Sequence, residues 1–169
     1  RSSLVPAMLD ASPPDGKETW LNAASAGWRR AKMQVVLEPL LPADLLPRLV
    51  VRLQNLYAHG CWSNGALLER KGQDDASASR AVVQQNRRER QLDIECAGIY
   101  PEDLRGQLFH VLEKLLQEGY HGLGLEARVS CPQCDDGACP LSSITKCLEK
   151  SRASMTCISC VEDIPIEHL

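Results

Sequence analysis

Apolar residues at helical spacing predict two long helices. The first lies between Asp44 and Gly60, where leucine and valine recur every three or four residues, with Asp44 as the expected N-cap and Pro47 in the first turn. The second runs from Pro101 to Gly119, and its acidic first turn suits the helix dipole. Its apolar stripe consists of Leu104, Leu108, Val111, Leu112, Leu115 and Leu116.

Alternation of apolar and polar residues predicts the strands of a sheet. In the second predicted strand, Met33, Val35 and Leu37 share one face, while polar side chains dominate the other. Two further strands flank the basic turn Arg87–Arg90 and therefore form a hairpin, so part of the sheet is expected to be antiparallel. The predicted strands cover residues 3–9, 32–38, 62–71, 81–85, 91–96 and 123–129.

Six of the eight cysteines lie within residues 131–160. Four of them form the motifs Cys131-Pro-Gln-Cys134 and Cys157-Ile-Ser-Cys160, which are separated by 22 residues. A C-x-x-C turn folds the chain back so that both sulfurs can face one ion, and two such turns supply the tetrahedral four-thiolate site that Zn²⁺ prefers. We therefore predict a structural Zn²⁺ that pins the last segment to the strand ending at Ser130.

Other interpretations of these cysteines fit the sequence less well. Disulfides suit small secreted domains, whereas this chain is long enough to bury its own core and shows no secretory signal. A thioredoxin-like site needs one C-x-x-C at a helix N-terminus, and a catalytic zinc keeps an open position and a nearby base. Cys147 is expected as a core thiol on a short helix over residues 141–150, and Cys139 is the alternative ligand. Cys61 and Cys96 are expected to be small hydrophobic core residues.

The patterns together predict an α+β fold. It contains a mixed or antiparallel sheet, two long helices on one face, and a C-terminal zinc-knuckle segment. We expect residues 1–130 to form the core, and residues 131–169 to form a cysteine-rich, zinc-binding segment that packs on it. Because the sequence opens on Arg1 rather than methionine, we expect it to be a segment of a longer protein.

Charge and hydropathy narrow the classes of partner. The chain has 19 Lys and Arg residues against 22 Asp and Glu residues, a net charge of −3. This balance does not favour a nucleic-acid or anionic-membrane surface, because both need clustered excess positive charge. No apolar stretch approaches the roughly 20 residues that span a bilayer.

Catalytic motifs are not evident. The fragment Gly16-Lys17-Glu18 lacks two requirements of a phosphate-binding loop, since position 11 is Ala11 and Glu18 stands where Ser or Thr should follow the lysine. The four histidines are scattered along the sequence. We therefore expect no catalytic residues and no nucleotide cofactor in this chain.

Four stretches in order carry a family resemblance: "SLVPAML", "LLPADLLPRLVVRL", "CWSNGALL" and "ARVSCPQC". Together they resemble the C-terminal half of the COR domain (COR-B) of Roco proteins, in which a Ras-like GTPase domain called Roc precedes COR. The resemblance extends over about residues 3–160. The positions that match the family pattern are Leu4, Val5, Pro6, Pro42, Arg48, Leu53, Trp62, Gly65, Cys131, Pro132 and Cys134.

The resemblance implies a non-catalytic domain that couples to the Roc GTPase domain of the same polypeptide and, in relatives, mediates dimerisation. It implies a cytoplasmic role in intracellular signalling, with GTP bound only by the Roc domain outside this sequence. We expect a monomer or a weak homodimer. The alternative interpretation is a free-standing zinc-stabilised adaptor that binds another protein or nucleic acid through the knuckle region.

Overall fold

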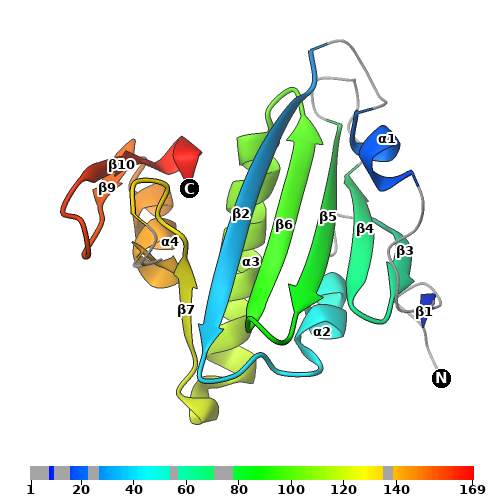
Figure 1. The fold of residues 1–169 in the computed structure, drawn as a ribbon, viewed down its shortest axis with the longest axis horizontal. Helices are drawn as coiled ribbons and strands as arrows, with labels where there is room; N and C mark the ends of the chain where they lie inside the picture. Colours follow the sequence, from blue (N-terminus) through cyan, green and yellow to red (C-terminus); the bar gives the residue numbers. More distant parts are fainter. Residues whose placement is uncertain (1–7, 10–15, 23–26, 54–56, 71–77, 135–138) are drawn as a thin grey trace.

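A computed structural model describes residues 8–9, 16–22, 27–53, 57–70, 78–134 and 139–169 (Figure 1). A long sheet, helices on both of its faces and a C-terminal lobe make up these residues. In chain order the elements are β1 (Met8–Leu9), α1 (Lys17–Asn22), β2 (Arg29–Glu38), α2 (Leu45–Arg52), β3 (Tyr57–Trp62), β4 (Gly65–Arg70), β5 (Ser79–Asn86), β6 (Gln91–Gly98), α3 (Pro101–Gly119), η1 (His121–Leu123), β7 (Glu126–Val129), β8 (Cys139–Pro140), α4 (Leu141–Glu149), β9 (Ser154–Thr156), β10 (Asp163–Pro165) and η2 (Ile166–His168).

The main sheet has the strand order β1-β3-β4-β5-β6-β2-β7-β8. β1 runs parallel to β3, and all other neighbours in this sheet are antiparallel. β2 is the junction of the fold, because it pairs with β6 over Arg29–Val36 and with β7 over Val35–Glu38. The mixed, mainly antiparallel sheet and the α+β class predicted from the sequence are confirmed.

The helices α2 and α3 lie on the same face of this sheet and share one core with it (Figure 1). Met33, Val35 and Leu37 of β2 are buried there, as the alternation predicts. The stripe of α3 is buried as well, apart from the partly buried Val111. Burial of such side chains contributes roughly 1.5–3 kcal/mol each, so this face supplies most of the folding energy.

The first helix is shorter than predicted. α2 ends at Arg52, and Tyr57 to Gly60 belong to β3, so the predicted extension to Gly60 is wrong. Asp44 occupies the N-cap position but makes no capping hydrogen bond with its side chain. Its carboxylate instead accepts a hydrogen bond from the Tyr120 hydroxyl at 2.7 Å, which ties the start of α2 to the end of α3.

Two predicted strands differ from the observed ones. The single strand predicted over 62–71 is part of a hairpin, in which β3 and β4 are joined by the two-residue turn Ser63-Asn64. The strand predicted over 123–129 begins only at Glu126, because Leu123 lies in the 3₁₀ turn η1 and is half exposed. The predicted strand at 3–9 falls mostly outside the described residues, apart from β1.

A second, smaller apolar cluster lies on the opposite face of the sheet, under α1. Its buried members come from α1 and from strands β3 to β6. Trp20 and Trp28 pack against it, and the guanidinium of Arg80 lies 4.9 Å from the centre of the Trp20 ring. The polar face predicted for residues 32–38 is observed on β2, where Lys32 and Gln34 are exposed.

Asp93 provides a pH-dependent test of this opposite face. Partial burial raises the pKa of its carboxyl, although Gln91 Nε2 donates to Oδ1 at 2.8 Å. A folded-state pKa above the unfolded one makes the native state lose stability as pH rises through that folded pKa. We therefore expect Asp93→Asn to be more stable than wild type at pH 7. The difference should vanish below the ordinary carboxyl pKa of 3.8.

Denaturant unfolding at pH 7 and at pH 3 measures this difference. Glu89→Gln, a change in the exposed β5–β6 turn, is the control and should not alter the free energy of unfolding. A less stable Asp93→Asn at pH 7 would show that the ion itself is favoured where it lies.

Candidate metal centre

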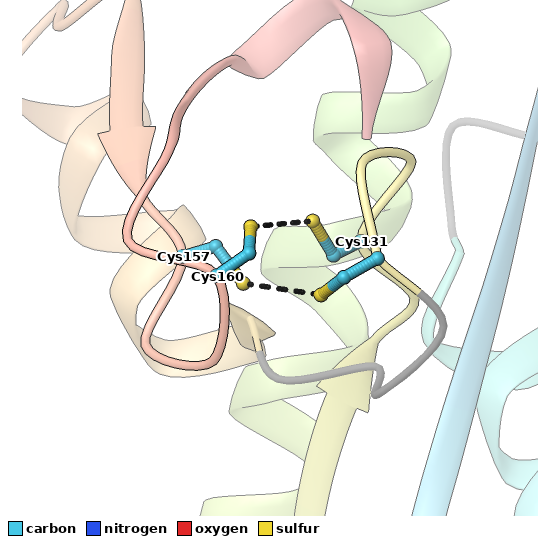
Figure 2. Close-up of side chains that lie close together, drawn as sticks. Cys131, Cys157 and Cys160 are labelled. Carbon is cyan, nitrogen blue, oxygen red and sulfur yellow. Dashed lines mark hydrogen bonds between the residues drawn. The ribbon is translucent and has the colours of Figure 1, made fainter.

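The four cysteines of the two predicted knuckles meet beside the end of β7 (Figure 2). Ser130 N donates to Gln34 O at 3.3 Å, which is the last backbone bond before the chain leaves the sheet. The first knuckle, residues 131–134, follows at once. The second, residues 157–160, lies between β9 and β10, whose antiparallel pairing fixes its two ends.

The sulfur positions fit a tetrahedral ion. All four Sγ atoms lie within 4.8 Å of one another. Across the two knuckles, Cys131 Sγ is 3.9 Å from Cys160 Sγ, and Cys134 Sγ is 3.8 Å from Cys157 Sγ. A tetrahedron with metal–sulfur bonds of about 2.3 Å has edges of about 3.8 Å. A disulfide would need about 2.05 Å, far shorter than either of these distances.

Backbone groups of the knuckles favour the thiolate form that a metal requires. The backbone N–H groups of Cys160 and Ser159 lower the pKa of the Cys157 thiol to about 6. In the first knuckle, Gln133 N donates to Cys131 Sγ at 3.4 Å. Both knuckles therefore present N–H groups to sulfur, and the four residues could hold a metal ion.

Cys139 lies next to this group without belonging to it. It sits in β8 opposite Val129 and is fully buried. Burial, together with the neighbouring Cys157 and Cys131, raises the pKa of Cys139 to about 12, so it stays a neutral thiol. Cys147 is only partly buried and packs against the core from α4, while Cys61 and Cys96 are buried core residues as predicted.

The cysteine-rich segment also packs on the core through apolar side chains. Leu141, Ile144, Ile164, Ile166 and Leu169 are buried and belong to the same apolar cluster as α3 and the sheet. The segment is therefore attached to the core by contacts that are independent of any metal.

A buried arginine adds a polar attachment that the sequence did not reveal. Arg105 of α3 is only 4% exposed, and its Nη2 donates to Ile166 O at 3.2 Å and to Glu167 O at 2.6 Å. Burial lowers its pKa. The two carbonyl oxygens compensate the cost of removing the guanidinium from water. These hydrogen bonds hold η2 against the start of α3.

The second knuckle contains a strained residue. Val161 follows Cys160 with φ of +60°, a left-handed conformation that is unusual for a β-branched side chain, and it is 74% exposed. Its N–H donates to Cys157 O at 2.9 Å, so the turn needs this backbone. Glycine adopts the same conformation without steric cost.

We expect Val161→Gly to stabilise the chain by about 1 kcal/mol, because it removes the strain and buries nothing new. Thermal unfolding measures the change as a rise in melting temperature of about 2–4 °C. Val161→Ala is the control: it keeps a Cβ in the left-handed conformation and should gain less. Equal gains from both variants would show that the side chain, not the backbone, sets the cost.

The remaining sequence candidates lie apart from this centre. Lys17 begins α1 and donates to Gln84 Oε1 at 3.2 Å, so it is engaged with the sheet, while position 11 lies outside the described residues. The histidines lie in four different elements: His59 in β3, His110 in α3, His121 in η1 and His168 in η2. Among the described residues, no helix is long and apolar enough to cross a membrane.

Comparison with known families identifies the fold. A family model described as "C-terminal of Roc, COR-B domain" matches residues 29–169. The match covers every element from β2 to η2, including both knuckles and the segment between them. A search of curated proteins found no match.

Proposed function

Because this chain belongs to the COR-B family, the domain C-terminal to Roc, we propose that it is the non-catalytic regulatory domain of a Roco GTPase. In this proposal it docks against the Roc domain of its own polypeptide, or against a second copy of itself, and so transmits the nucleotide state in cytoplasmic signalling. The single observation that carries the proposal is the family match over residues 29–169.

The architecture is consistent with a docking role. Strands β2 and β7 turn a largely polar face outward, where Lys32, Gln34 and Glu126 are exposed. Such a face suits the modest, partly polar contacts found between domains of one chain. A tether raises the effective concentration of the neighbouring domain, so the contact needs little affinity of its own.

We also propose that the metal centre holds one structural Zn²⁺ through Cys131, Cys134, Cys157 and Cys160. Four thiolates close the coordination shell, as in structural zinc sites, and leave no position for a substrate. When bound, zinc would neutralise the knuckle thiolates and fix the 131–169 segment to the end of β7. The docking surface would then be presented by a rigid domain.

The regulatory proposal is tested by calorimetry between this chain and the separately purified Roc domain, loaded with GDP or with a non-hydrolysable GTP analogue. A domain that reads nucleotide state must bind the two forms with different affinity, since equal affinities shift no equilibrium. We expect a difference of at least about fivefold, the lower end of typical allosteric coupling. Indistinguishable affinities would refute coupling, and GTP binding by this chain alone would refute the non-catalytic assignment.

A further inference from the structure

Among the residues that the structure describes, no strand pairs with one edge of β2 over its first half, the half away from β7 (Figure 1). Pairing with β7 covers only Val35–Glu38 and ends at the bond from Ser130 N to Gln34 O. In an antiparallel sheet, the backbone groups of successive residues point to opposite edges, so those of Arg30 and Lys32 point to the same edge as those of Gln34. Within the described ranges, no backbone group pairs with Arg30 or Lys32 on that side.

A cavity of about 430 Å³ adjoins this edge. Between the edge and the C-terminal segment it is bounded by Met33, Val129 and Leu169, all of which are buried, and by His168. Lys32 lines the same cavity and is exposed. The open backbone therefore lies beside a space that has an apolar floor and a rim of both charges, Lys32 together with Asp93 and Glu95.

Charge argues against a second copy of the chain as the occupant. If two β2 edges paired antiparallel, Lys32 would face Lys32 or Arg30. Arg30 already pairs with Glu18 and Glu95, so the repulsion would come mainly from Lys32. Like charges directly opposite each other destabilise a strand pair. Basic side chains on an edge are also a common protection against self-association of sheets. An acidic strand meets no such penalty.

The other edge of β2 shows which sequence suits it. There β6 places Ile94 opposite Met33, Glu95 opposite Lys32, and Cys96 opposite Ala31. Along β6, which runs antiparallel to β2, the three residues are therefore apolar, acidic and apolar in turn. The side chains of β2 lie beside a neighbouring strand at either edge. A strand that adds to the open edge should therefore have the same pattern as β6, with an acidic residue between two apolar ones.

We propose that the open edge of β2 is a strand-addition site for an extended segment of a partner protein in which an acidic residue lies between two apolar ones. The segment runs antiparallel to β2, bonds to the backbone of Lys32 and Arg30, and places its acidic side chain beside Lys32. Its first apolar side chain enters the cavity over Met33. This site goes beyond the proposed docking to Roc and does not depend on the metal centre.

A peptide that copies β6 provides the probe. We suggest residues 93–98 with Cys96→Ala, which keeps an apolar residue on each side of Glu95, capped at both ends, titrated into the isotope-labelled 169-residue chain and followed by NMR. We expect the largest shifts at the amides of Arg30, Lys32 and Gln34. A control peptide that also carries Glu95→Lys should bind about tenfold more weakly. Shifts confined to another surface, or equal binding of the two peptides, would overturn the proposal.

Two variants of Lys32 separate backbone from charge. Lys32→Pro removes the free-edge N–H, and proline is tolerated where that group faces outward from an edge. Lys32→Glu keeps the N–H and reverses the charge. We expect each variant to weaken peptide binding about tenfold. In Lys32→Pro the cause is a lost hydrogen bond and crowding by the proline ring, and in Lys32→Glu it is repulsion between like charges. Lys114→Glu, the same charge change on the exposed face of α3, should bind like wild type.

The amide signals of the β5–β6 hairpin report whether each variant stays folded. If Lys32→Pro disturbs them, Lys32→Glu still decides the outcome. Wild-type binding by a folded Lys32→Glu would refute the assigned register. A dimer that forms in wild type and is lost in either variant would show that a second copy, rather than an acidic segment, occupies the edge.

Discussion

Cys157→Ser is expected to abolish zinc binding and to lower the melting temperature by roughly 10 °C or more. The purified wild-type chain should carry close to one Zn²⁺, and the variant close to none, because four thiolates within 4.8 Å form one closed site. Structural zinc contributes on the order of 10 kcal/mol in small peptides, and each kcal/mol corresponds to about 2–4 °C in a domain of this size. A strong chelator should act on wild type as the substitution does.

The loss should be local before it is global. The 131–169 segment keeps its apolar contacts and its bonds to Arg105, so the core should remain folded when the ion leaves. Hydrogen exchange should therefore accelerate first in the backbone of β9 and β10, and later in β5 and β6.

A matched control is available in the same segment. Cys147→Ser changes a partly buried cysteine of α4 that lies outside the four-sulfur group, and it should keep full zinc content. Zinc near zero in a wild-type chain with an intact fold would refute the metal assignment. Equal zinc loss in Cys147→Ser and Cys157→Ser would refute the assigned ligands.

Gly65→Ala is expected to destabilise the chain by about 3 kcal/mol, at the upper end of typical overpacking. A Cβ at this position would lie 2.1 Å from Cζ2 of Trp62, whose side chain is fully buried. The tryptophan has to move out of the smaller apolar cluster, or the β3–β4 turn has to open. Thermal unfolding should show a fall in melting temperature of roughly 6–12 °C.

Gly122→Ala serves as the control for this substitution. A Cβ there meets no heavy atom within 4 Å, so the change should stay within about 0.5 kcal/mol. The cause is then isolated by a double mutant. In a Trp62→Ala background, Gly65→Ala should cost much less than in wild type, because the clash has been removed. Additive effects of the two substitutions would mean that Gly65 acts through backbone freedom instead.

The elements that the sequence predicted best are those with one buried face. α3 and the β5–β6 hairpin each repeat apolar residues at the period of their own backbone, so local spacing alone defines them. β4 lacks that signal because Ala66, Leu67 and Leu68 are all buried, some under α1 and others under α2 and α3. A strand covered on both faces shows no alternation. The polar pair Ser63-Asn64, whose residue types are common in turns, was the local signal for this hairpin.

The clustering of Cys131, Cys134, Cys157 and Cys160 was also predictable, because a C-x-x-C turn is a local structure and two such turns supply the four ligands that a zinc ion would take. The position of Cys139 was not. Its spacing made it an alternative ligand, but pairing with Val129 in the sheet buries it beside the group as a neutral thiol. That outcome depends on the register between β7 and β8, which no local pattern encodes.

The sequence by itself determined the period of each one-faced element, the α+β class, the pairing of the knuckles and the family resemblance, since all of these rest on short local motifs and on their order along the chain. Only the tertiary structure decided what Arg105 binds, which face α1, Trp20 and Trp28 cover, and where the described residues leave β2 unpaired. Those features depend on contacts between residues 60 or more positions apart, such as Arg105 with Ile166 and Arg80 with Trp20. Side chains so distant in sequence meet only once the strand order has been fixed by burial of the common core.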